Sequence, residues 1–189
     1  MNELEAANVP LIGVLMQDIA TPLDPSQQET IARWATKTAM VMECITTRRK
    51  PFHTRTECAQ LRLSWQIPNR TFVWLGRYTG FFNIASFATD GWTAEPNHPQ
   101  TMHAYINTVV LGRLAMQTLT FHVPDTYSGG PLTIQPAAGA WDKTLINIWP
   151  TQPTVRWPPP LSFSDDGPRP LTLDGLRNRW SGGKALEPE

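Results

Sequence analysis

Histidine and cysteine are the usual protein ligands of zinc, and here they lack the spacing that a metal site needs. The two cysteines, Cys44 and Cys58, form no Cys-x-x-Cys pair, and the chain has no His-Glu-x-x-His sequence. Structural zinc sites take closely spaced ligands of this kind. His98 and His103 flank a predicted loop-to-strand junction and could share a metal, but ordinary polar or partly buried histidines are the simpler interpretation. His53 and Cys58 lack a third ligand, so the sequence predicts no metal site.

Nucleophilic catalysis and phosphate binding also lack their sequence patterns. Ser128 precedes Gly129 but is outside a Gly-x-Ser-x-Gly elbow. Residues 181–184 (Ser-Gly-Gly-Lys) are superficially similar to a phosphate-binding loop, yet they miss its spacing. Asp165 and Asp166 lie in a loop flanked by Gly and Pro residues, where turn formation explains them. We therefore predict no catalytic residue and no cofactor, and whether the chain is an enzyme stays open.

One segment is strongly basic and makes nucleic-acid binding a candidate function. Between residues 48 and 77 the only acidic residue is Glu57, and the basic residues are Arg48, Arg49, Lys50, Arg55, Arg62, Arg70 and Arg77. Such side chains release counterions from nucleic acid whatever its base sequence, and Trp65 and His53 lie among them as candidate stacking groups. The alternative is a solvated surface with Trp65 in the core. The predicted nucleic-acid-binding residues are Lys37, Arg48, Arg49, Lys50, Arg55, Arg62 and Arg77.

Size and composition point to one folded domain. The 189 residues fit one domain or one domain with a small appendage, and eight Trp and seven Phe supply large apolar side chains for a core. The formal net charge is zero, so no overall field draws the protein to nucleic acid or membrane. No apolar run approaches the roughly 20 residues of a membrane span. Without a secretory signal, reduced thiols and a cytoplasmic location are expected.

Two helices are predicted at the start of the chain. Residues 2–17 have helical periodicity, with a kink or break expected at Pro10. Asp24 and Pro25 form a strong start for the second helix, as N-cap and first helical residue. Residues 26–29, which begin with Ser and end with Glu, offer an alternative capping box.

The second helix should present one apolar stripe to a core and end near Thr46. The stripe consists of Ile31, Trp34, Ala35, Thr38, Ala39, Met42 and Ile45. Cys44 is expected to be a small buried residue near the end of this helix. A shorter helix is predicted over residues 55–65.

The remainder of the chain is predicted to be mostly strand and loop. Aromatic and β-branched patterns predict strands over residues 72–78, 81–87, 104–110, 114–123 and 145–149. A hairpin connection is expected at residues 111–113. Residues 88–101 and 124–143, rich in Gly, Pro, Asp or Asn, are predicted loops. Residues 157–160 should be extended because three prolines follow Trp157, and residues 171–180 should form a short helix.

These elements predict an α+β fold, with N-terminal helices followed by a small, mostly antiparallel sheet, a Pro-rich segment and a short C-terminal helix. We expect one domain over residues 1–180, with a flexible tail over residues 181–189. Its expected parts are helical (1–66), sheet (67–150) and a Pro-rich wrap with the short helix (151–180).

Several runs of residues carry a resemblance to a known family. They are Met1-Asn2-Glu3-Leu4-Glu5, Ala32-Arg33-Trp34-Ala35-x-Lys37-Thr38-Ala39-Met40-Val41, Val73-Trp74-Leu75-Gly76-Arg77, Ile148-Trp149-Pro150, Trp157-Pro158-Pro159 and Arg179-Trp180. Together they resemble the region that follows the nuclease module in bacterial and phage HNH endonuclease-like proteins. The resemblance runs nearly the whole length of the chain.

The resemblance implies an accessory role. In this family the upstream module carries Cys-x-x-Cys pairs for zinc and a His that activates water beside a divalent metal. Those residues have no counterpart here, so no catalytic residue can be carried over. The expected function is a non-catalytic accessory domain that helps to position DNA or supports a nuclease module. DNA, a nuclease module or another protein are the expected partners, and a membrane is not.

Two further functions remain open. The chain could be a protein-interaction module of phage or defence-system origin that uses the aromatic and Pro-rich residues 124–160. It could also be an uncharacterised enzyme whose site gathers His98, His103 and a loop carboxylate such as Asp90.

Overall fold

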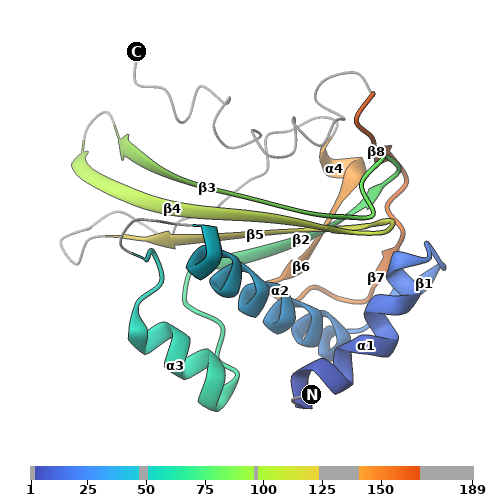
Figure 1. Cartoon of the computed structure of the whole chain (residues 1–189), viewed down its shortest axis with the longest axis horizontal. Helices are drawn as coiled ribbons and strands as arrows, with labels where there is room; N and C mark the ends of the chain where they lie inside the picture. Colours follow the sequence, from blue (N-terminus) through green and yellow to red (C-terminus); the bar gives the residue numbers. More distant parts are fainter. Residues whose placement is uncertain (1–2, 47–50, 96–97, 124–140, 167–189) are drawn as a thin grey trace.

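The computed structural model describes residues 3–46, 51–95, 98–123 and 141–166. These residues form an α+β fold in which the three longest helices lie on one face of a mostly antiparallel sheet (Figure 1). The predicted fold class is confirmed at this level. The predicted helix over residues 171–180 and the tail over residues 181–189 lie outside the described residues.

The helices are α1 (Glu3–Met16), α2 (Pro25–Thr46), α3 (Arg55–Ser64) and the short α4 (Trp141–Thr144). The predicted break at Pro10 is wrong, because α1 continues through it. Proline removes one backbone donor from a helix, and here both Pro10 and Ala6, whose carbonyl loses that donor, are exposed. The unpaired carbonyl can therefore be hydrated.

The start of α2 is set by a capping box that differs from the predicted alternative. The Asp24 side chain accepts the N–H of Gln27 (2.9 Å), and the Gln27 side chain accepts the N–H of Asp24 (3.0 Å). This reciprocal pair satisfies two backbone donors at the N-terminus of the helix. The Asp24–Pro25 start is confirmed.

The main sheet has the order β3-β4-β5-β2-β6, with antiparallel neighbours. Its strands are β2 (Thr71–Tyr78), β3 (Ile84–Glu95), β4 (His98–Leu111), β5 (Leu114–His122) and β6 (Leu145–Trp149). The short β8 (Ser162–Phe163) pairs in parallel with the end of β2. β1 (Thr21–Leu23) and β7 (Val155–Trp157) form a separate two-stranded sheet.

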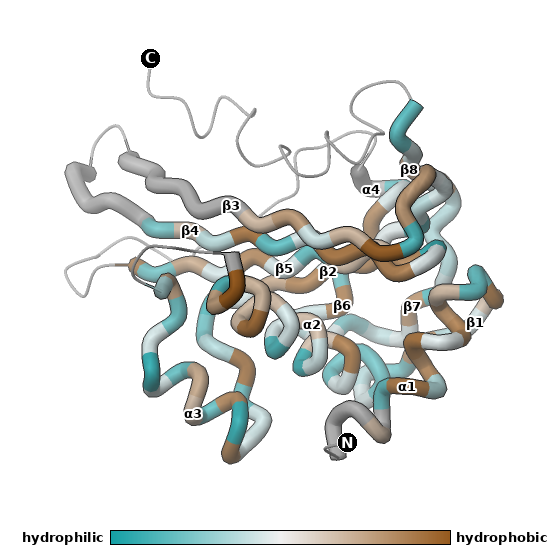
Figure 2. Tube along the Cα trace, in the orientation of Figure 1, coloured by the Kyte–Doolittle hydropathy of each residue, from teal (hydrophilic) through white to brown (hydrophobic). Residues whose placement is uncertain are grey.

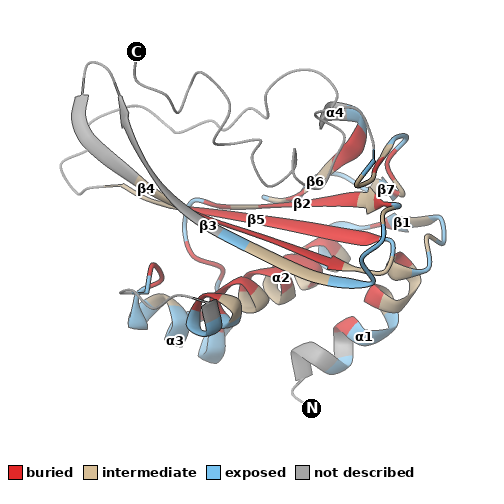
Figure 3. Cartoon of the chain, turned by 45° about the horizontal axis from the view of Figure 1, so that its top comes forward, coloured by how far each residue is buried: buried red, intermediate tan, exposed pale blue. Residues whose placement is uncertain are grey.

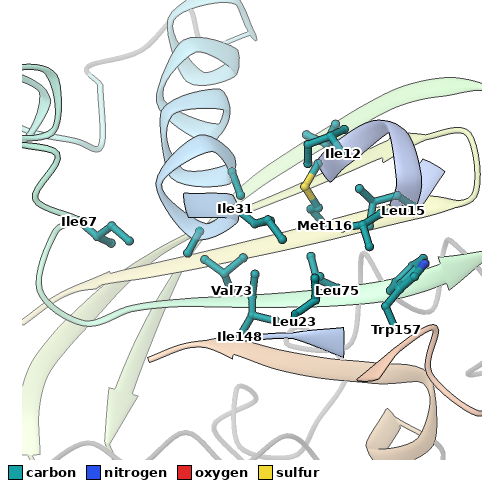
Figure 4. Packing of buried hydrophobic residues seen from close by; sticks show 14 of the residues in the cluster. Ile12, Leu15, Leu23, Ile31, Ile67, Val73, Leu75, Met116, Ile148 and Trp157 are labelled. Atoms are coloured by element: carbon teal, nitrogen blue, oxygen red, sulfur yellow. The ribbon is translucent and has the colours of Figure 1, made fainter. Parts of the chain in front are cut away.

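The main core lies between the helices and one face of the sheet. Alternation along β2 directs Val73 and Leu75 toward this core, where they meet Ile31 of α2 and Leu15 of α1 (Figure 4). Trp74 belongs instead to a second apolar cluster on the opposite face. The central strands β2 and β5 are accordingly buried along most of their length (Figure 3).

Two predicted loops contain regular structure. Residues 88–95 and 98–101, predicted as loop, extend a long β3–β4 hairpin. Backbone pairing along this hairpin outweighs the low strand propensity of Asp, Gly and Pro in it. Residues 141–144 form α4, whereas the rest of the second predicted loop, 124–140, lies outside the described residues. The hairpin at residues 111–113 and the strand at residues 145–149 are confirmed.

No helix in the described part of the chain has both the length and the apolar character that a membrane crossing requires.

Candidate functional site

α2 and α3 lie beside one another and run antiparallel. Arg33 of α2 donates from Nε to the carbonyl oxygen of Trp65, the residue that caps the end of α3 (3.0 Å). Near the other end of α2, Glu43 contacts Phe52 and His53, which come just before α3. The end of α3 therefore lies beside the middle of α2, and the start of α3 beside the end of α2.

Glu43 is a buried carboxylate that anchors the chain ahead of α3. Its side chain is 2% exposed. One carboxylate oxygen accepts the backbone N–H of Phe52, and the other accepts the N–H of His53 (3.3 Å) and lies 2.7 Å from Nδ1 of the His53 ring. A buried charge persists only when it is paired and hydrogen-bonded. Glu43 thus fixes residues 52 and 53 against the last turns of α2.

The His53 ring is as deeply buried as its partner. Burial lowers the pKa of His53, and the hydrogen bond and charge of Glu43 oppose this shift only in part. The neutral ring that donates from Nδ1 to Glu43 leaves Nε2 without a proton. Nε2 has no hydrogen-bond partner among the described residues.

A second carboxylate–histidine pair ties α3 to the sheet. Glu57 in the first turn of α3 lies 2.9 Å from Nε2 of His122 on β5. The same carboxylate accepts the N–H and hydroxyl of Thr54, whose side chain in turn accepts the N–H of Glu57. Burial acts to raise the pKa of Glu57, but the hydrogen bonds from Thr54 and His122 outweigh it and lower the pKa below its ordinary value.

Phe52 fills the space between the two pairs. Its ring stacks on His122 with centroids 4.1 Å apart and meets His103 edge to face at 4.7 Å. It also stacks on Tyr105 at 5.7 Å. Aromatic pairs in these geometries add to the stabilisation from burial alone. Phe52 therefore packs the segment just before α3 against β4 and β5.

These side chains form one cluster, which we call the anchor and which has a structural role. Its members are Glu43, Phe52, His53, Glu57, His103, Tyr105 and His122. Its members pack against one another, and Glu43 and His53 are buried. Across the described ranges, no three His, Cys, Asp or Glu side chains are arranged to hold a metal ion. The cluster holds α3 in place beside α2.

Holding the two helices in this way creates an apolar groove of about 730 Å³ between them. We call it the α2–α3 groove. Its lining residues are Lys37, Met40, Val41, Cys44 and Ile45 from α2, and Cys58, Leu61, Arg62 and Trp65 from α3 and its cap. Figure 2 shows that brown, hydrophobic positions lie at the end of α2 that faces α3.

The groove exposes an apolar side chain that the sequence pattern assigned to the core: Ile45 is 72% exposed. Val41, which is outside the predicted stripe, is 47% exposed. The predictions that Ile45 and Cys44 are buried are therefore wrong. Ile31, Ala35 and Ala39 of the predicted stripe are buried. The buried face of α2 also includes Ala32, Met40 and Glu43, because Glu43 belongs to the anchor.

The structure separates the predicted nucleic-acid-binding residues. Lys37 and Arg62 come together in the α2–α3 groove, next to Trp65, which is half-buried and not in the main core. Arg55 is exposed at the start of α3, outside the groove. Residues 48–50 (Arg48, Arg49 and Lys50) lie outside the described residues.

Arg77 lies at the far end of β2 from α3. It is paired with Asp18, which follows α1. Arg70 is exposed just before β2, and its carbonyl oxygen accepts the N–H of Phe121 (3.2 Å). Among the described basic residues, Arg77 is therefore separated from Lys37 and Arg62.

The other candidate catalytic residues do not assemble a site within the described ranges. His103 packs on Phe52, whereas the side chains of His98 and Asp90 lie outside the described set. Ser128 and residues 181–184 are also outside it. Asp165 accepts the hydroxyl of Tyr78 (2.6 Å) and the N–H of Phe81 (2.8 Å), and so closes the turn after β2. With the burial of the Tyr78 ring, this hydrogen bond raises the pKa of Tyr78 to about 12.

Sequence reasoning missed Glu43, Tyr105 and His122 as members of the anchor. Glu43 had one signal, since it is the only charged residue of the otherwise apolar run Met40–Ile45. Tyr105 and His122 lie on strands and reach the anchor only through tertiary packing.

No protein-family model, curated protein or solved structure matches this chain.

Proposed function

We propose that this chain is a non-catalytic accessory domain that holds a partner protein, and that an amphipathic helix of the partner docks in the α2–α3 groove. Under the resemblance to HNH endonuclease-like proteins, the partner would be a nuclease module. The apolar groove is the observation that carries the proposal. Exposed apolar surface that is gathered in one place marks interaction sites.

The pattern of the lining residues favours a helix. The α2 residues are spaced at i, i+3, i+4, i+7 and i+8, and the α3 residues at i, i+3, i+4 and i+7. These are the spacings of helical faces that pack against another helix. Arg62, which is exposed, adds positive charge that complements an acidic partner. Amphipathic helices are common ligands of such grooves.

Two other occupants fit the groove less well. Small-molecule sites enclose most of their ligand, whereas the Ile45 wall of this groove is largely open to solvent. DNA affinity depends on many basic contacts to phosphates, whereas most of the lining is apolar and only Lys37 and Arg62 are basic. DNA positioning, the other expected role, is therefore tested as an alternative outcome.

The test is a titration of the full chain with a fluorescent model peptide, an amphipathic helix of about 14 residues with one leucine stripe. Ile45→Lys should weaken peptide binding at least about tenfold, because an apolar wall residue is replaced by a charge. Leu63→Lys is the matched control. Leu63 is 80% exposed on α3 but does not line the groove, so this change should leave binding unaltered.

A duplex DNA of about 20 base pairs serves as the second probe, at salt concentrations between about 50 and 200 mM. The proposal expects weak duplex binding that is insensitive to Ile45→Lys. It is wrong if the peptide does not bind, or if Ile45→Lys and Leu63→Lys act alike. Tight, steeply salt-dependent duplex binding that is lost on Arg62→Ala would instead favour DNA positioning.

A further inference from the structure

The two ends of the α2–α3 groove differ in chemistry. The antiparallel arrangement, fixed by the Arg33–Trp65 hydrogen bond, puts Lys37, Arg62 and Trp65 toward one end. Ile45 lies at the opposite end of the α2 wall. The α2 lining from Lys37 to Ile45 spans about 12 Å at 1.5 Å per residue, which is the length of two to three turns of a docked helix.

The acidic side chains of the two helices are already engaged elsewhere. Glu29 pairs with Arg33 at 2.8 Å, Glu43 is buried in the anchor, and Glu57 binds Thr54 and His122. These are the acidic residues of α2 and α3. Arg62, which is exposed, therefore gives its end of the groove a positive character that neither helix neutralises.

We propose that the groove selects the direction of the partner helix: it takes a helix whose C-terminal end is acidic and lies against Arg62. The apolar stripe of that helix then runs toward Val41 and Ile45. This inference rests on the proposed docking function and specifies the chemistry of the partner.

The dipole of the partner helix favours this orientation in the groove. The C-terminal end of a helix carries partial negative charge, which cations stabilise. Acidic side chains in the last turn place full charges at the same end and interact with the guanidinium group of Arg62. The reverse orientation would set the positive helix end against Arg62 and bring carboxylates to the apolar end near Ile45.

The experiment compares three helical peptides that share one leucine stripe. The first has two glutamates in its last turn, the second has them in its first turn, and the third has lysines in its last turn. Each is titrated into the full chain by fluorescence anisotropy at low and moderate salt. The first peptide should bind about fivefold to tenfold more tightly than the second, and the third should bind most weakly. Added salt should reduce these differences because the charges are near the surface.

Charge-reversal variants locate the effect. Arg62→Glu should abolish the preference for the first peptide and improve binding of the third. Arg55→Glu is the matched control, because Arg55 is exposed on the same helix and does not line the groove. It should change the order of the peptides little.

The outcomes separate the two proposals. Equal binding of all three peptides, with loss on Ile45→Lys, would overturn the selection by charge and leave docking in the groove intact. If no peptide binds, docking in the groove is itself wrong. A preference for the first peptide that persists in the Arg62→Glu variant would also overturn the inference, since the charge would be recognised elsewhere.

Discussion

At the scale of single residues, Glu43 links the fold to the groove. Its carboxylate gathers two backbone N–H groups and an imidazole, and all of these lie just ahead of α3. Hydrogen bonds to a buried charge are stronger than neutral ones, and losing the charge leaves its partners unsatisfied. The position of α3, and so the shape of the groove, depends on this side chain.

Glu43→Ala should therefore lower the free energy of unfolding by about 2 to 4 kcal/mol. Glu29→Ala on the same helix is the control, because the Glu29–Arg33 pair is partly exposed and should contribute less than about 1 kcal/mol. Urea denaturation of both variants measures the difference. Equal losses would show that Glu43 is not the anchor.

The lowered pKa of His53 predicts a pH dependence. The unfolded chain protonates His53 near its ordinary pKa of 6.5, whereas burial keeps the folded ring neutral to lower pH. The folded state then binds fewer protons, so this contribution to stability is fully present above about pH 6.5 and is lost as the pH falls. Glu57 has its own lowered pKa, and its contribution is lost only in a more acidic range.

Unfolding measured between about pH 7.5 and about pH 5.5 should show stability falling by at most about 1.4 kcal/mol per pH unit for one proton. His53→Asn is the comparison, since the Asn amide can still donate to Glu43 but does not titrate. Its profile should be flatter over this range. A slope that is the same in both proteins would assign the effect to other groups.

At the scale of elements, α3 is a short helix that depends on its ends. It has 10 residues, and isolated helices of this length are marginal in water. The capping box of Thr54 and Glu57 and the contact of Glu57 with His122 compensate for this.

Thr54→Ala should accordingly cost about 1 kcal/mol of stability. It should also weaken binding of the model peptide, because frayed first turns of α3 carry Cys58 away from the groove. Thr56→Ala, at an exposed position in the same turn, is the control and should change both quantities less. Calorimetric melting with the peptide titration tests this, and unaltered binding in Thr54→Ala would mean that the cap does not shape the groove.

Elements with strong local signals were predictable from sequence, and those that depend on distant partners were not. The start of α2 at Pro25 and the hairpin before Leu114 follow from local turn and capping chemistry. Helical periodicity placed Ile31, Ala35 and Ala39 in the core correctly. The burial of Glu43 depends on residues nine and ten positions away, so periodicity missed Glu43 and assigned the exposed Ile45 to the core. The β3–β4 hairpin likewise depends on pairing between strands, which composition does not report.

At the scale of the whole molecule, the main core and the groove use neighbouring faces of the same helix and share Met40. Ile31 and Ala35 of α2 join the core on the sheet, while Val41 and Ile45 remain at the surface beside α3. The sequence indicated that Lys37, Arg62 and Trp65 are candidate binding residues. That they meet in one groove follows only from the antiparallel placement of α2 and α3, which the anchor establishes.

The groove contains its own probes. Cys44 and Cys58 are the two cysteines of the chain, and both line the groove. Both thiols are exposed, and partial burial raises the pKa of the Cys58 thiol, so it should react more slowly than an ordinary cysteine. The most direct test of docking is the rate at which a maleimide modifies each thiol with and without the acidic-ended helical peptide. Saturating peptide should slow both reactions at least about tenfold. Unchanged rates at saturation would show that the helix binds elsewhere and would contradict the assignment of the groove as the docking site.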